Sequence, residues 1–280
     1  MTDWYVDWQH QGHVELFDGR HLLSRANLLR NYEAFNDVRL LNERVDQTRP
    51  RTLLEVGCAT GEFSRYLRFT YPAVDYYGID ISQPAIARAR QKYPHMRYFL
   101  GDPGLSLAEN VKALRIPDHP EVVYAKDVIH HQTQPLAFLS GLLRLASEAV
   151  ILRTRTRDAG ETVTDPEHSC QYHYGGWMPY IVLNLQELID HVQREAPRCE
   201  VVVYRNHMIL GGRENRFLPK ECYLPQTGTA ETAVGVFLST GRPGRVHLED
   251  RKDQDLEYPL QVRLMTYVDQ VLRRCASWPR

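Results

Sequence analysis

The sequence lacks the features that mark several large classes of protein. Its five cysteines are widely spaced and contain no Cys-x-x-Cys pair, which excludes a disulfide framework and a zinc site built from cysteine alone. No apolar run approaches the ~20 residues that span a bilayer, so no membrane partner is expected. The formal net charge of −1 provides no general attraction to nucleic acid or to anionic lipid. Asp3 stands where a signal peptide would be basic, so we expect a cytoplasmic protein.

The order of apolar segments indicates an α/β fold. Short apolar runs alternate with segments of helical spacing over most of the 280 residues. This alternation predicts a Rossmann-like, mainly parallel, seven-stranded sheet with helices on both faces. The predicted strands are 52–57, 75–80, 97–100, 121–125, 149–154, 200–204 and 232–239. The predicted helices between them are 62–69, 83–92, 135–146 and 184–194.

Three further regions extend this domain, which we place at residues 50–240. An N-terminal arm, residues 1–49, has helical spacing from about 21 to 46. Two insertions, at about 155–183 and 207–231, are too long for ordinary connections, and long ordered loops tend to be functional. The tail, 241–280, contains an amphipathic helix at about 258–275, which packs on the core or pairs with a second subunit in a homodimer. In the arm, Trp4, Tyr5 and Trp8 either cover a ligand or anchor the terminus.

The first predicted strand runs into a turn that contains two glycines. Gly57 and Gly61 permit tight backbone geometry, and amides at the turn and the helix start can face a polar ligand. The alternative is an ordinary strand-to-helix turn. A dinucleotide fingerprint would need glycine at positions 59 and 62, which are Ala59 and Glu62, and glutamate there would repel a pyrophosphate. A zwitterionic ligand fits better, with Glu55 close to its ammonium group.

Acidic residues follow the next three strands. Asp80 lies 19 residues after Gly61, where a carboxylate can accept hydrogen bonds from ribose hydroxyls. Asp102 follows the third strand and could accept from an adenine amino group, and Asp127 follows the fourth. Each acid alone is more typical of a helix cap or a loop. Together with Glu55, however, they converge on one edge of a parallel sheet.

This set of motifs resembles the class I, Rossmann-like S-adenosylmethionine-dependent methyltransferases, in particular the small-molecule types 11 and 12. Residues 55–61 resemble the family's first motif, with Ala59 where many members have glycine. Gly78-Ile79-Asp80 resembles the ribose-binding acid, and Gly101-Asp102 the adenine-contacting acid. The resemblance covers about residues 50–155 and, more loosely, the sheet to about 240.

The resemblance implies S-adenosylmethionine as cofactor and S-adenosylhomocysteine as product. The residues that it implies for cofactor binding are Glu55, Gly57, Cys58, Ala59, Gly61, Asp80, Ile81, Gly101, Asp102, Asp127 and Val128.

Two adjacent histidines border the expected transfer site. His130 and His131 belong to the segment 127–131, which is similar to the family's segment after the fourth strand. A histidine titrates near pH 6.5 and can accept a proton from an acceptor, so both are candidate catalytic bases. The alternative is that they only pack or hydrogen-bond in the loop. A metal site with His168 or His173 is not expected, because no dense ligand spacing appears.

The first insertion supplies candidate acceptor-binding residues. Its aromatic segment contains Tyr172, His173 and Trp177, which either cover an acceptor pocket or pack against the sheet. Arg153 and Arg155 alternate at the end of the fifth strand and share one face, where they bind an acidic group or remain solvated. The second insertion contains weaker candidates for the same role, Arg213, Arg216 and Lys220.

These observations favour methyl transfer to oxygen or nitrogen of a small-molecule acceptor. The alternatives are methylation of RNA or protein and, in another class, a non-catalytic scaffold that binds the same nucleoside. The signature Asn/Asp-Pro-Pro-Tyr/Phe, typical of amino-group methylation on bases, is absent after the fourth strand. Nucleic acid is therefore not the expected partner.

Overall fold

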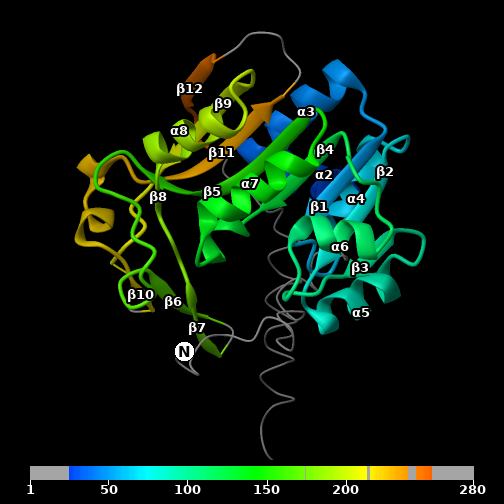
Figure 1. Ribbon diagram of the computed structural model, residues 1–280, viewed down its shortest axis with the longest axis horizontal. Coiled ribbons are helices and arrows are strands. Elements are labelled where there is room, and N and C mark those ends of the chain that lie inside the picture. Colours follow the sequence, from blue (N-terminus) through cyan, green and yellow to red (C-terminus); the bar gives the residue numbers. More distant parts are fainter. Residues whose placement is uncertain (1–24, 174, 213–214, 239–243, 254–280) are drawn as a thin grey trace, which may run out of the picture.

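The computed structural model describes residues 25–173, 175–212, 215–238 and 244–253, and a nine-stranded sheet forms its centre (Figure 1). Eight strands follow the order β12-β9-β11-β5-β4-β1-β2-β3, and β8 pairs with the end of β5. Their bounds are β1 (Thr52–Val56), β2 (Asp75–Asp80), β3 (Arg97–Leu100), β4 (Val122–Lys126), β5 (Ala149–Arg157), β8 (Leu183–Asn184), β9 (Glu200–His207), β11 (Ala230–Phe237) and β12 (Val246–Asp250).

The predicted Rossmann-like class is confirmed. Strands β3, β2, β1, β4 and β5 are neighbours in this order and run parallel, so their carboxyl ends share one edge. Among the strands of this sheet that the structure describes, only β11 runs antiparallel to its neighbours, β5 and β9. Two of these strands, β8 and β12, were not predicted. β12 is exposed along its whole length and ends in Glu249-Asp250, which is typical of a protected sheet edge rather than of a buried strand.

Helices cover both faces of the sheet (Figure 1). One face packs against α6 (Leu107–Ala113), α7 (Pro135–Leu145) and α8 (Leu185–Glu195) through one apolar core. The other face packs against α2 (Arg25–Glu33), α3 (Asn36–Thr48), α4 (Glu62–Thr70) and α5 (Gln83–Lys92) through a second core. Helix α6 was not predicted, although Ser106 and Glu109 form a capping box that marks its start.

The two long insertions meet in a separate three-stranded sheet. The first contributes β6 (Cys170–His173) and β7 (Gly176–Pro179), and the second contributes β10 (Arg216–Phe217). A small apolar core that includes Tyr180 and Cys222 supports it. Short 3-10 helices, η3 (Lys220–Tyr223) and η4 (Pro225–Thr227), follow β10. We call residues 170–173, 175–180 and 215–217 the cap.

The predicted aromatic arm of Trp4, Tyr5 and Trp8 and the predicted helix at 258–275 lie outside the described residues. The helices that the structure does describe are all too short or too polar to cross a bilayer.

Candidate functional site

A cavity of about 880 Å³ lies beyond the carboxyl ends of β1 to β5, between the sheet edge and the cap. This volume is within the range of small-molecule and cofactor sites. The structure brings most of the predicted site residues together around it. They are Glu55, Gly57, Cys58, Ala59, Asp80, Ile81, Gly101, Asp102, Asp127, Val128, His130, His131, Arg153, Arg155 and His173.

Three predicted residues are not among those that line the cavity: Gly61, Tyr172 and Trp177. Gly61 has φ of 79° at the start of α4, and a Cβ there would lie 2.4 Å from the Tyr98 hydroxyl. Tyr172 is exposed, and its ring meets Trp177 edge to face at 5.5 Å. Gly61 therefore serves packing, and the two aromatic rings stabilise the cap.

The turn after β1 is held in shape by Asp80. Gly57 has φ of 80° and Ala59 has φ of 46°, and a Cβ on Gly57 would lie 2.3 Å from Val128 Cγ2. The Ala59 amide donates to Asp80 Oδ2 at 2.8 Å, and the Ser82 amide donates to Oδ1 at the same distance. The amides of Gly57 and Cys58 both donate to the Ile79 carbonyl. These amides of the turn are thus bonded within the protein, and Asp80 lines the cavity together with Gly57, Cys58 and Ala59.

Glu55 is buried beneath this turn and accepts a hydrogen bond from the Tyr76 hydroxyl. Burial raises the pKa of its carboxyl group to about 8, against the opposing effects of Tyr76 and Lys126. The carboxyl group is therefore mostly protonated at neutral pH. A cation beside it would favour the ionised form.

Asn110 on α6 positions Asp102. The Asp102 amide donates to Asn110 Oδ1 at 2.7 Å, and Asn110 Nδ2 donates back to the Asp102 carbonyl at 2.8 Å. Asp102 Oδ1 accepts from the Gly104 amide. Asn110 was not predicted from the sequence, although the capping box of Ser106 and Glu109 marks the start of α6, the helix that carries it.

The two histidines lie in the short 3-10 helix η2 (Ile129–His131) and touch the cap. His131 Nδ1 lies 2.7 Å from the Pro179 carbonyl, which can only accept, so Nδ1 carries the proton and Nε2 keeps a lone pair. Burial lowers the pKa of His131 to about 4. His130 is buried 4.1 Å away, and burial, then His131, lowers its pKa well below the usual range. Both rings are therefore neutral at pH 7.

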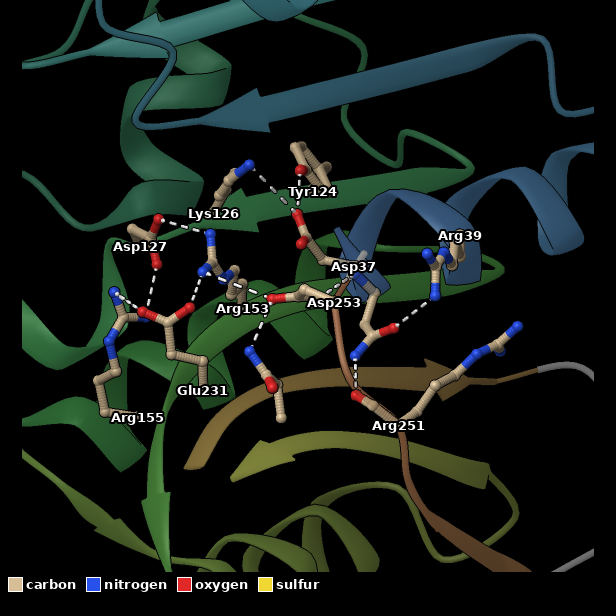
Figure 2. Close-up of polar contacts among 12 residues, drawn as sticks. Asp37, Arg39, Tyr124, Lys126, Asp127, Arg153, Arg155, Glu231, Arg251 and Asp253 are labelled. Atoms are coloured by element: carbon tan, nitrogen blue, oxygen red, sulfur yellow. Dashed lines mark hydrogen bonds and ion pairs between the residues drawn. The ribbon is translucent and has the colours of Figure 1, made fainter. Parts of the chain in front are cut away.

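Arg153 and Arg155 are buried ion-pair partners, so the alternative of solvated loop charges is wrong. Arg155 Nη1 donates to Asp127 Oδ1 at 2.8 Å, and Arg153 Nη1 lies 3.5 Å from Asp127 Oδ2 (Figure 2). Both guanidinium groups also pair with Glu231. Burial opposes the charge on Asp127, but the two arginines outweigh it and hold its pKa well below the ordinary value. Asp127 itself has φ of 57°, in the left-handed region.

Comparisons with known proteins agree with this geometry. Residues 54–151 match a family model described as a methyltransferase domain. The search of curated proteins found no match. Residues 54–151 thus form a methyltransferase domain, and the enzyme class is that of the S-adenosylmethionine-dependent methyltransferases.

Solved structures resemble the methyltransferase in fold. An O-methyltransferase from the trans-AT polyketide synthase multienzyme of Brevibacillus brevis, in complex with S-adenosyl-L-homocysteine, is 11% identical, covering 84% of this chain and 81% of its own, with a TM-score of 0.50. The plantazolicin methyltransferase BpumL is 13% identical, covering 80% of this chain and 86% of its own, with a TM-score of 0.48. At these identities the likeness concerns the fold.

The cap contributes further cavity residues to the methyltransferase, and among them Arg216 had been a weaker candidate from the sequence. Gln171, Tyr180, Asn215 and Arg216 line the cavity from β6, β10 and the segments beside them. Arg216 Nε donates to Gln171 Oε1 at 3.2 Å, and its guanidinium carbon lies 4.4 Å from the centre of the Tyr180 ring. Of the second basic cluster, Arg216 alone lines the cavity, while Arg213 lies outside the described residues. The pairing of β10 with β6 had no local sequence signal.

Proposed function

We propose that this methyltransferase transfers a methyl group from S-adenosylmethionine to an oxygen or nitrogen of a small-molecule acceptor. The observation that carries the proposal is the shared cavity. The same space of about 880 Å³ is lined by the turn and acids of the sheet edge and by the histidines and cap. A cofactor site and a covered acceptor site therefore adjoin. A scaffold without catalysis would be expected to have a closed or filled acceptor pocket.

The donor set at the sheet edge fits the cofactor. A carboxylate has about four lone-pair sites, so Asp80 can accept ribose hydroxyls in addition to its two backbone amides. Asp102, which follows the neighbouring strand, would accept a hydrogen bond from the adenine amino group. Glu55 would pair with the ammonium group of the amino-acid part of the cofactor. When bound, the cofactor would supply an electrophilic methyl group on its sulfonium sulfur, and S-adenosylhomocysteine would be the leaving group in an in-line displacement by the acceptor.

His131 is the residue that we propose as proton acceptor. Its Nδ1–H donates to the Pro179 carbonyl, so Nε2 is the ring nitrogen that carries the lone pair and would accept a proton from the acceptor hydroxyl or amine. With a pKa of about 4, His131 is a weak base but is always in its neutral form at pH 7. For a hydroxyl acceptor, proton transfer to it becomes favourable as the new bond to carbon forms, because the oxygen that then carries both the methyl group and the proton is strongly acidic.

The test uses the purified chain with S-adenosylmethionine and a panel of small hydroxyl and amine compounds. Mass spectrometry should find one methylated product together with S-adenosylhomocysteine. His131→Gln should then lower kcat by about 10²-fold or more and leave the Kd for S-adenosylhomocysteine unchanged. His95→Gln, at an exposed position outside the cavity, is the matched control. Methylation only of RNA or protein would contradict the acceptor class, and His131→Gln with full kcat would contradict the base.

A further inference from the structure

Four charged side chains form an ion-pair group beside the cavity, and a fifth, Asp253, lies 4.0 Å from Arg153 (Figure 2). Arg153 and Arg155 leave β5, with Asp127 on one side and Glu231 on the other. Arg155 lies 2.8 Å from Asp127 and 3.1 Å from Glu231. The two arginine side chains are about nine-tenths buried, with exposures of 9% and 10%, and Glu231 is 17% exposed. Asp127 and both arginines line the cavity, whereas Glu231 is not among the lining residues.

Strand register sets this arrangement. Glu231 on β11 is the direct cross-strand partner of Arg155, and side chains two residues apart on β5 share a face. Asp127 follows β4, the neighbour of β5 on the other side. Arg155 therefore lies between two carboxylates, and Arg153 lies near both of these and near Asp253. Arg153 is further fixed by the ring of Phe35, at 4.6 Å from its centre.

Carboxylates offset the charges of the two arginines. Burial opposes the charge on each arginine, but the neighbouring acids, above all Asp127, outweigh it and raise the pKa of both guanidinium groups. Glu231, like Asp127, pairs with both arginines, whereas Asp253 pairs with Arg153 of the two. Removing the carboxylate of Glu231 would leave the charge beside the cavity more positive by one unit, and salt screens a buried charge only weakly.

We propose that Glu231 is a positioning residue that makes the cavity tolerant of a cationic cofactor. It holds Arg153 and Arg155 against Asp127 and neutralises the charge that they would otherwise direct at the sulfonium. The inference rests on the proposed function, since it requires the sulfonium to bind in this cavity. S-adenosylmethionine carries a positive sulfur and S-adenosylhomocysteine a neutral one, so the ratio of their affinities reports the charge of the group.

The test is calorimetry of both nucleosides with the full chain and its variants. Glu231→Gln should weaken S-adenosylmethionine on the order of tenfold more than S-adenosylhomocysteine, the size of a unit-charge interaction over roughly 10 Å at an effective dielectric constant of about 20. Arg155→Gln, which removes a positive charge, should shift the ratio the opposite way. The double variant removes one charge of each sign and should restore the wild-type ratio.

A control variant removes the same charge at the opposite end of the sheet. Glu200 lies at the start of β9, where its carboxylate is paired with Arg245, and it does not line this cavity. Glu200→Gln should leave the ratio unchanged.

The outcomes separate the two proposals. Equal weakening of both nucleosides by Glu231→Gln, or a double variant worse than either single one, would mean that Glu231 only supports the fold and would overturn the inference. If Glu231→Gln does not fold, judged by circular dichroism, the sign of the shift in Arg155→Gln decides. A wild-type chain that binds neither nucleoside would overturn the proposed function as well.

Discussion

The two sides of the cavity are built in different ways. On the cofactor side, residues from β1 to β4 follow one another along the chain, and backbone amides or Asn110 hold the acids in place. On the cap side, residues far apart in sequence meet through β10 and β6, which pair at only two positions. Local geometry thus determines the cofactor side, whereas a small tertiary contact determines the cap side. Substitutions should therefore damage nucleoside binding on one side and acceptor turnover on the other.

The largest effect is expected from Asp80→Ala. This change removes the proposed ribose acceptor and also the bond that holds Ala59 in its left-handed conformation. Because hydrogen bonds to charged groups contribute about 1.5–3 kcal/mol each, the Kd for S-adenosylhomocysteine should rise about 100-fold in calorimetry. Asp75→Ala, at the exposed start of the same strand, is the matched control and should leave the Kd unchanged. A similar Kd for the two variants would remove Asp80 from the site.

Gly57→Ala tests the shape of the turn. Alanine would have to adopt the φ of 80° found at this position, and its Cβ would collide with the Val128 side chain. We expect a loss of about 2 kcal/mol in the free energy of unfolding, measured with urea, and weaker nucleoside binding. Gly244→Ala requires a similar φ of 71° but has open space around it, so it should show only the backbone cost of about 1 kcal/mol. Equal losses would show that the contact with Val128 is unimportant.

The cap side is tested by His173→Ala and Tyr172→Ala. Only His173 lines the cavity, whereas Tyr172 is exposed. Both variants should bind S-adenosylhomocysteine within about twofold of the wild type, but His173→Ala should slow methylation of the acceptor. If His173→Ala leaves turnover intact and Tyr172→Ala reduces it, the assignment of the cavity face of β6 is wrong.

The smallest effect is a proton released when the cofactor binds. Glu55 is mostly protonated in the free protein because burial raises its pKa to about 8. An ammonium group beside it lowers that pKa, so at pH 7 up to about one proton should leave on binding. Calorimetry in two buffers of different ionisation enthalpy measures this number. Glu55→Gln should abolish the release, and equal heats in both buffers for the wild type would place the ammonium elsewhere.

Much of the cofactor side could be predicted from the sequence. Strand β2 and helix α5 have the predicted bounds, and Asp80 and Asp102 lie at the predicted strand ends. The acceptor side could be predicted only in part. The insertions were recognised by their length, but Tyr180 and Arg216 reach the cavity because β6 and β10 pair, and Tyr172 faces away from it.

The sequence by itself determined the sheet, the glycine turn and the convergence of acids on one edge. It could do so because strand alternation, positive-φ glycines and the parallel order are local signals. Only the tertiary structure decided that Arg153 and Arg155 are enclosed by Asp127 and Glu231, and that Asn110 holds Asp102. Those contacts depend on the register between strands and on the packing of a helix against a loop, which no single segment encodes.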